Sequence, residues 1–155
     1  MLLLKGHPYY QIFYDSKEKL IEFKFFYDLA QVKESVFKET IYALYKELMK
    51  HEVKKVLHNY YDLIYTFSQN LLYLIHKEIY PEVSQKVKPE KVAFLLPFEP
   101  YTQYQIVNMV YQIDNDQNDG IMRRFFTDYD KAMQWLTEDN KDISYYRYKP
   151  EQVLV

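Results

Sequence analysis

Apolar and polar residues alternate over two stretches near the start of the chain, Tyr9–Tyr14 and Lys19–Tyr27. Alternation with a period of two is typical of a strand that buries one face, and the polar residues 15–18 between the stretches suit a turn. The two stretches therefore predict an antiparallel hairpin. The second strand has one apolar face, made by Ile21, Phe23, Phe25 and Tyr27.

Three longer segments repeat apolar residues at spacings of three and four, which is the period of an amphipathic helix. They predict helices over Gln31–His51, over Thr66–Val87 and from Tyr101 to about Asn115. Inside the second helix, Pro81 lacks an amide hydrogen and is expected to end or kink it. After the third helix, the polar run Asp114–Gly120 (DNDQNDG) predicts a loop.

A strand pattern follows each of these helices, at Lys54–Tyr60, Lys91–Leu96 and Arg123–Phe126. Lys91–Leu96 is apolar on both faces, which is typical of a central strand. The last strand leads through a polar turn into an amphipathic helix, whose inner face carries Ala132, Trp135 and Leu136.

The resulting order, ββαβαβαβα, predicts an α/β fold because strands that alternate with helices form parallel sheets. We expect one mostly parallel five-stranded sheet with an N-terminal antiparallel hairpin and helices mainly on one face. Residues 1–138 are predicted to form a single domain and residues 139–155 a C-terminal tail, either an added strand or an arm.

The residue totals restrict the classes of function. A net charge of −2 lacks the basic surplus that neutralises phosphates, so we expect no nucleic-acid partner. The chain has no cysteine, and its four histidines lack metal-site spacing, so neither a metal nor another cofactor is expected. The run Leu2–Leu4 is too short for a signal peptide or a membrane span. We therefore expect a cytoplasmic protein that does not insert into membranes.

Four segments together resemble the STAS (SpoIIAA-like) family of small bacterial domains: IEFKFF, KKVLHNYYDL, KVAFLLP and FFTDYDKAMQWL. The likeness covers Tyr9 to Glu138 and is most specific at the end, in Phe126, Asp128, Ala132, Trp135 and Leu136. The resemblance implies a single sheet with four helices on one side. It also implies a role in protein interaction or regulation, sometimes with ligand sensing, and without chemistry.

Some members of that family carry a phosphorylated serine at the start of the second helix. At this place the chain offers Ser68 and Thr66 as phosphoacceptor candidates, but the family's flanking aspartate and glycine are absent. The alternative is that these hydroxyl groups cap the helix.

A binding corner is predicted where two strands end. Tyr60, Tyr61 and Asp62 follow one strand and Phe98 and Glu99 the next. Carboxyl ends of neighbouring strands are the usual ligand edge of an open α/β sheet. The alternative is that Asp62 and Glu99 are solvated loop or cap residues.

Two further sets of residues are candidates. His58 is able to act as a base oriented by Asp62, although a half-buried histidine on the open sheet face is the alternative. An uncovered sheet face and hairpin edge carrying Tyr9, Tyr14, Phe26 and Tyr60 is predicted to be a protein interface.

These observations predict a non-enzymatic binding or regulatory module that acts through a protein partner or through self-association, for example as a homodimer. One alternative is a carrier or sensor of a small apolar ligand or lipid, held between helices and sheet. The other is a small enzyme that uses Asp62, Glu99 or His58.

Overall fold

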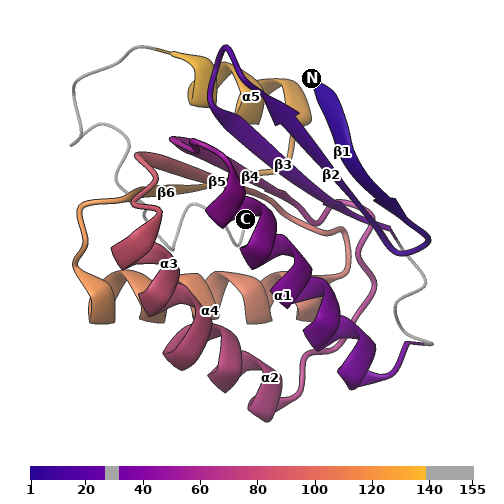
Figure 1. Ribbon diagram of the computed structural model, residues 1–155. Helices are drawn as coiled ribbons and strands as arrows, with labels where there is room; N and C mark the ends of the chain where they lie inside the picture. The colour runs from indigo at the N-terminus through magenta and orange to yellow at the C-terminus, as the bar shows by residue number, and fades with distance from the viewer. Residues whose placement is uncertain (27–31, 139–155) are drawn as a thin grey trace.

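The computed structural model describes residues 1–26 and 32–138 and has an α/β fold (Figure 1). A single sheet of six strands follows the order of the sequence, β1-β2-β3-β4-β5-β6. The first two pairings are antiparallel and the other three are parallel. The strands are β1 Leu2–His7, β2 Tyr10–Asp15, β3 Leu20–Phe25, β4 Lys55–Asn59, β5 Lys91–Leu95 and β6 Met122–Phe126.

The antiparallel hairpin and the mostly parallel sheet confirm the predicted fold class, but the count of five strands is wrong. The extra strand is β1, which pairs with β2 along the edge of the sheet. Its run of three leucines does not alternate with polar residues. Leu2 and Leu3 are both exposed, so burial imposes no period of two that the sequence would display.

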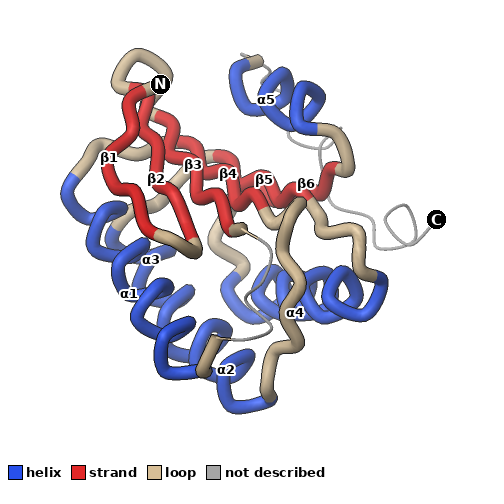
Figure 2. Tube along the Cα trace, turned by 90° about the vertical axis from the view of Figure 1, so that its right-hand side faces the viewer, coloured by secondary structure: helices blue, strands red, loops and turns tan. Residues whose placement is uncertain are grey.

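Three of the helices described cover one face of the sheet (Figures 1 and 2). The first is α1, Glu34–Lys50, and the third is α4, Pro100–Gln117. Between them in the sequence is one continuous helix, here called the composite helix. It has three parts: α2 Gln69–Tyr73, the π-helical turn η2 Leu74–Ile79 and α3 Tyr80–Lys86.

Pro81 explains the π-helical turn. It lies in the first turn of α3 and has no amide hydrogen to donate to the preceding turn. The N–H of Tyr80 bonds to the carbonyl of Ile75, five residues back, which is the π spacing. The helix therefore continues through Pro81. Of the two outcomes expected at this residue, the helix does not end, and the backbone irregularity takes the form of a π-helical turn.

The last helix, α5 Tyr129–Thr137, packs on the opposite face of the sheet (Figure 2). Its Ala132, Trp135 and Leu136 form a second core with alternate residues of three strands, namely Leu20, Leu57, Ala93 and Leu95. The expectation of helices mainly on one face is met by α1, the composite helix and α4. The arrangement of four helices on one side, which the family resemblance implies, is wrong for α5.

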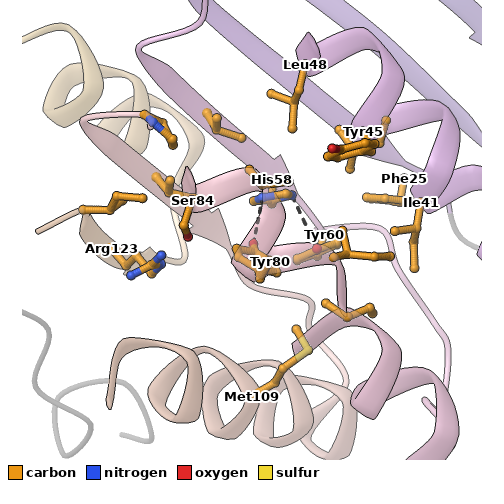
Figure 3. Close-up of a pocket in the computed structure, with 18 of the residues that line it drawn as sticks. Phe25, Ile41, Tyr45, Leu48, His58, Tyr60, Tyr80, Ser84, Met109 and Arg123 are labelled. Atoms are coloured by element: carbon orange, nitrogen blue, oxygen red, sulfur yellow. Dashed lines mark hydrogen bonds between the residues drawn. The ribbon is translucent and has the colours of Figure 1, made fainter. Parts of the chain in front are cut away.

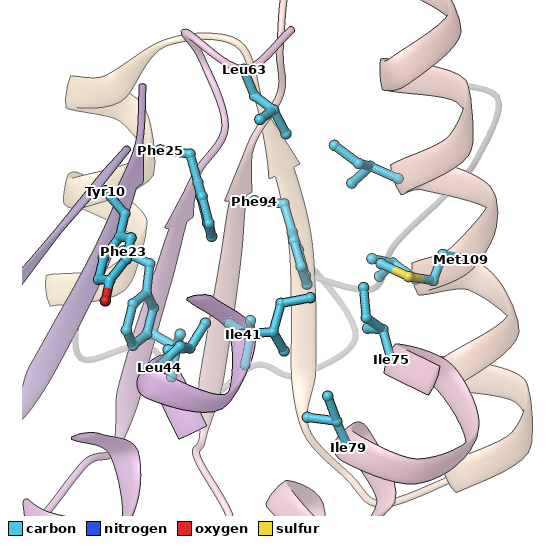
Figure 4. Packing of buried hydrophobic residues seen from close by; sticks show 14 of the residues in the cluster. Tyr10, Phe23, Phe25, Ile41, Leu44, Leu63, Ile75, Ile79, Phe94 and Met109 are labelled. Carbon is cyan, nitrogen blue, oxygen red and sulfur yellow. The ribbon is translucent and has the colours of Figure 1, made fainter. Parts of the chain in front are cut away.

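Alternation along the strands divides the side chains between these two cores. The larger core contains Phe23, Phe25 and Phe94 from the sheet, facing Ile41 and Leu44 of α1, Ile75 and Ile79 of η2, and Met109 of α4 (Figure 4). In register, Phe23 lies beside His58, His58 beside Phe94, and Phe94 beside Phe125. Of this row of rings, His58 lines the site described below.

Helix α4 extends beyond the predicted Asn115. It includes the first residues of the predicted loop and ends at Asn118, which adopts the left-handed conformation of a helix C-cap with φ 42°. Asn tolerates this conformation because its short polar side chain bonds locally. The start of the first predicted helix at Gln31, the end of the second predicted strand at Tyr27 and the tail 139–155 lie outside the described residues.

Candidate ligand-binding site

An apolar cavity lies between the sheet and the helices that cover it (Figure 3). Its volume is about 60 Å³, counted as space open to the centres of water molecules. One water needs about 10–15 Å³ on that measure, so the cavity has room for several waters or one small ring. Aromatic and aliphatic side chains make most of its wall, among them Phe25, Phe37, Ile41, Leu44, Ile75 and Ile79.

Three hydrogen-bonding side chains meet in this apolar wall. The imidazole of His58 lies between two tyrosine hydroxyl groups, with Nε2 3.1 Å from Tyr80 Oη and Nδ1 3.5 Å from Tyr60 Oη (Figure 3). His58 and Tyr60 stack on each other at 5.7 Å between ring centroids. The triad joins the end of β4 to the first residue of α3.

The surroundings keep all three groups uncharged near neutral pH. Burial, and then the charge of Arg123, lower the pKa of His58 to about 3. Burial also raises the pKa of Tyr80 and, together with the neighbouring Tyr80, that of Tyr60. His58 is therefore a neutral imidazole with one N–H donor and one acceptor nitrogen.

Arg123 supplies a buried positive charge at the other end of the cavity. Its Nη1 lies 2.5 Å from Asp114 Oδ1, and its Nη2 lies 2.8 Å from Asp119 Oδ2. Nη1 also donates to Asp119 Oδ1 at 3.1 Å, so Asp119 is bound in a two-pronged geometry. The Arg123 side chain is 1% exposed, and its Nε has no hydrogen-bond partner among the described residues.

The composite helix brings its part of the site into place. A π-helical turn shifts the residues after it around the helix axis, and such turns are frequent at functional sites. Here Ile75 and Ile79 from η2 and Tyr80 from α3 all line the cavity. The π-helical turn before Pro81 therefore directly precedes Tyr80, whose hydroxyl group is the one group that this helix contributes to the triad.

Tyr80, Arg123, Asp114 and Asp119 are site residues that the sequence analysis missed. The sequence pattern does point to Arg123, because this residue and Phe125 share the core-facing side of β6. A charged group at such a position needs partners. The partners of Arg123 lie in the run that was predicted to be a loop. Tyr80 had only the neighbouring Pro81, which marked a helix irregularity and not a site.

The residues of the predicted binding corner do not lie together, because successive side chains point to opposite faces of the sheet. Tyr60 lies in the cavity, whereas Tyr61 and Asp62 line a groove of about 640 Å³ on the other side of the sheet, beside α5. His58, predicted on the open face, is 7% exposed on the helix-covered face, so that prediction is wrong. The reason is that α1 and the composite helix cover the face shared by His58 and Tyr60.

A buried carboxyl group forms the floor of this groove. Glu22 is 4% exposed, and its two oxygens accept from Asn59 Nδ2 at 3.1 Å and from Tyr129 Oη at 2.7 Å. Asn59 Oδ1 also accepts from the amide of Tyr61 at 3.2 Å. These bonds connect β3, β4 and the start of α5, so the groove has a rigid polar base.

Phe98 and Glu99 occupy different surroundings. Phe98 is 84% exposed and meets Tyr61 edge to face, at 6.2 Å between ring centroids. Glu99 caps α4, since its carboxylate accepts from the amides of Tyr101 at 3.1 Å and Thr102 at 2.6 Å. These bonds lower its pKa, chiefly the bond from the Thr102 amide. The cap alternative is therefore confirmed for Glu99.

Ser68 is the N-cap of α2. Its Oγ accepts from the amide of Leu71 at 3.1 Å and also lies in short contact with Glu34 of α1. The cap alternative is therefore confirmed for Ser68. Thr66 is exposed two residues earlier. Phosphorylation of either residue stays a prediction.

The residues of the predicted interface do not share one open face. Tyr14 donates to the carbonyl of Glu52 at 2.8 Å and packs against His51 at the end of α1. Tyr9 and Tyr60 both pack against the larger core. Only Phe26, next to Lys24 at 5.7 Å, lies on the α5 side. The common surface predicted for the four residues is therefore wrong.

The three residues proposed for an enzyme also lie apart. His58 lies in the cavity, Asp62 in the groove and Glu99 at the start of α4, and no hydrogen bond joins any two of them. In the part of the chain that the structure describes, no three His, Asp or Glu side chains are grouped as a metal site.

Comparison with known proteins adds no relative. No protein-family model, curated protein or solved structure matches the chain. The likeness to the STAS family therefore stays a prediction from the sequence. No helix within residues 1–26 and 32–138 has the length and apolar character needed to cross a membrane.

Proposed function

We propose that this protein is a non-enzymatic module that binds a small, mainly apolar molecule in the cavity between sheet and helices. The observation that carries the proposal is the His58–Tyr60–Tyr80 triad in a mostly apolar wall. Small-molecule sites are mostly apolar, with a few placed polar groups that orient the ligand. A close-packed core would fill this space with side chains, since interiors leave few voids larger than a water.

The π-helical turn supports the same function. It places a π-helical stretch of backbone beside the cavity, where Ile75 and Ile79 form part of the helical side of the wall. A regulatory module needs a ligand to change the energy of a nearby element. The composite helix lines the cavity together with α1 and α4, and it alone contains a π-helical turn among the described helices. Its exposed surface is therefore where we expect a partner to sense occupancy.

Binding is tested with benzene and cyclohexane as probes, monitored through the amide and methyl NMR signals of the full chain. Shifts confined to residues around the cavity, such as Ile75, Ile79 and Met109, are expected. Native mass spectrometry of freshly purified protein tests whether a ligand is retained. If neither probe shifts these signals and the purified protein has a ligand-free mass, the proposal is wrong.

A pair of matched variants separates the cavity from the rest of the core. Val92→Ile adds one methylene to the cavity wall, and Val110→Ile adds the same group to a buried position that does not line it. Both changes overpack the core to a similar degree. Only Val92→Ile is expected to weaken binding of the probes.

We also propose a protein-interaction surface as a second function, supported by the exposure of Phe98. Its ring meets the exposed ring of Tyr61 beyond the carboxyl ends of β4 and β5, so the two form an apolar patch there. Ile64 and Tyr101, close by in the sequence, are exposed as well. Exposed patches of this kind mark interaction sites more often than isolated apolar residues do. Self-association is the version that is tested directly.

Sedimentation velocity over a hundredfold range of protein concentration measures self-association. Phe98→Ser is expected to lower the association, whereas Tyr42→Ser, at an exposed position of α1, leaves it unchanged. A strict monomer at all concentrations contradicts self-association through this patch.

A further inference from the structure

The triad in the cavity holds one more hydrogen-bond donor than it can use internally. The groups contribute three hydrogens: the hydroxyl hydrogens of Tyr60 and Tyr80 and the single N–H of neutral His58. Only two hydrogen bonds join them, one at each nitrogen of the ring. One hydroxyl group donates to the bare nitrogen, and the other accepts from the N–H, so its own hydrogen is left over.

This count does not depend on the tautomer. If Nδ1 carries the hydrogen, the hydroxyl of Tyr60 keeps a spare donor, and if Nε2 carries it, the hydroxyl of Tyr80 does. In the described residues neither hydroxyl group has another hydrogen-bonding partner. Both residues line the cavity, so the spare donor is at the cavity wall in either case.

A second donor without a partner comes from Arg123, which also lines the cavity. Its two Nη atoms are bound to Asp114 and Asp119, but the buried Nε–H has no acceptor in the described residues. Leaving a buried donor unpaired is costly, and native structures seldom do so without water or a ligand. The buried hydroxyl of Ser84, also on the cavity wall, is a third group without a partner in the described residues. Hydrogens from a tyrosine, from Arg123 Nε and from Ser84 Oγ are thus available to an acceptor in this space, and the Ser84 oxygen also accepts.

The charges around Arg123 restrict which kinds of ligand atom are able to accept these hydrogen bonds. The guanidinium of Arg123 already has two carboxylate partners, so another anion would add to an excess of negative charge. A cation would lie beside the guanidinium and the unpaired N–H and O–H donors, with only hydroxyl oxygens to accept from it. An uncharged oxygen fits both conditions, because it accepts hydrogen bonds and adds no net charge.

Resting on the proposed function, we propose that the cavity selects an uncharged ligand with a carbonyl oxygen, such as a ketone, ester or amide, on a compact apolar body. The oxygen accepts from the spare hydroxyl group of the Tyr60–His58–Tyr80 triad, and the body contacts the surrounding rings. The triad then has every hydrogen bonded, in the bound state only.

The test compares cyclohexanone with methylenecyclohexane, which has nearly the same shape but no oxygen. Affinities are measured by NMR titration of the full chain and of a triple variant with Tyr60→Phe, Tyr80→Phe and His58→Phe. The ratio of the two affinities is compared between the two proteins, since this cancels the different hydration of the probes. The triple variant is expected to lower the preference for the ketone about fivefold or more.

A spectroscopic measurement on the unaltered protein covers the case in which the triple variant fails to fold. A hydrogen-bonded carbonyl stretches at lower frequency than a free one, so bound cyclohexanone should absorb below its frequency in hexane. A stretch equal to that in hexane overturns the inference.

The outcomes separate the two proposals. If both probes bind but the affinity ratio is equal in the two proteins, the cavity binds apolar molecules and the inference about the carbonyl is wrong. If neither probe binds, the proposed function is wrong as well. A preference for cyclohexylammonium or for cyclohexanecarboxylate over cyclohexanone also overturns the inference.

Discussion

The ammonium group of Lys91, at the start of β5, donates to the carbonyl oxygen of Trp135 at 2.8 Å. It also donates to the carbonyl of Glu138 at 2.8 Å and lies 5.1 Å from the centre of the Trp135 ring. A buried cation thus satisfies carbonyl groups at the C-terminal end of α5, where the helix dipole is negative. Lys91 is 5% exposed, and this contact explains how a charge is accommodated there.

Lys91→Met is expected to destabilise the fold by about 2 kcal/mol, because hydrogen bonds to charged groups contribute about 1.5–3 kcal/mol and methionine retains the apolar part of the side chain. Urea denaturation followed by Trp135 fluorescence measures the change. Lys131→Met, at an exposed position of α5, is the control and should change the stability by less than about 0.5 kcal/mol. Equal effects of the two substitutions would contradict the role of Lys91.

The low pKa of His58 predicts a specific loss of stability in acid. The folded protein keeps His58 neutral down to pH about 3, whereas the unfolded chain binds a proton near pH 6.5. Stability from this group is therefore complete above pH 6.5 and falls as the pH is lowered toward 3. The loss is on the order of 4 kcal/mol.

His58→Gln removes this titration and keeps one donor and one acceptor. The stability difference between the original protein and the variant should shrink, by on the order of 4 kcal/mol, between pH 7 and pH 3.5. Urea denaturation at each pH measures the difference, which cancels the contribution of the carboxyl groups common to both proteins. A difference that is independent of pH contradicts the buried, neutral state of His58.

Arg123→Met is expected to cost about 3–5 kcal/mol, because it leaves Asp114 and Asp119 close together without their cation. Asp114 is already disfavoured as an anion, since burial raises its pKa. Thermal unfolding followed by circular dichroism measures the effect. Arg124→Met, at the next position on the opposite face of β6, is the control and should cost less than about 1 kcal/mol.

Tyr129→Phe is expected to cost about 1 kcal/mol, because it removes the 2.7 Å hydrogen bond to the buried carboxyl group of Glu22. Burial, and then Glu22, raise the pKa of Tyr129, so its hydroxyl group remains a donor at any pH used for folding studies. Tyr101→Phe, at an exposed position of α4, should be neutral. Urea denaturation of both variants makes the comparison.

Sequence periodicity predicted the elements well where one face is buried and the other is wet. The strand with Ile21, Phe23 and Phe25 and the last helix with Trp135 both match the structure. Sequence periodicity was less successful in predicting which side chains of α4 are buried. In α4, the spacing of Tyr104 and Tyr111 from the buried Val107 and Val110 predicts that the two tyrosines face inward, but both are exposed. Thr102 and Gln105 are buried instead.

The binding site was the part least accessible to the sequence. The pattern placed His58 and Tyr60 on one face of a strand, which is correct, but it could not decide which face the helices cover. The partners of His58 and Arg123 are 22 residues away at Tyr80 and 9 residues away at Asp114. Periodicity within one element carries no information about contacts between elements.

The sequence by itself determined the order of the strands and helices after β1, the hairpin and the burial of β5 on both faces, because these follow from local periods and from the apolar residues of one strand. Only the tertiary structure decided that α5 covers the far face, that β1 completes the sheet and that a cavity lies beside His58. The reason is physical: a helix packs where a complementary apolar surface is left open, and that surface exists only after the strands have paired.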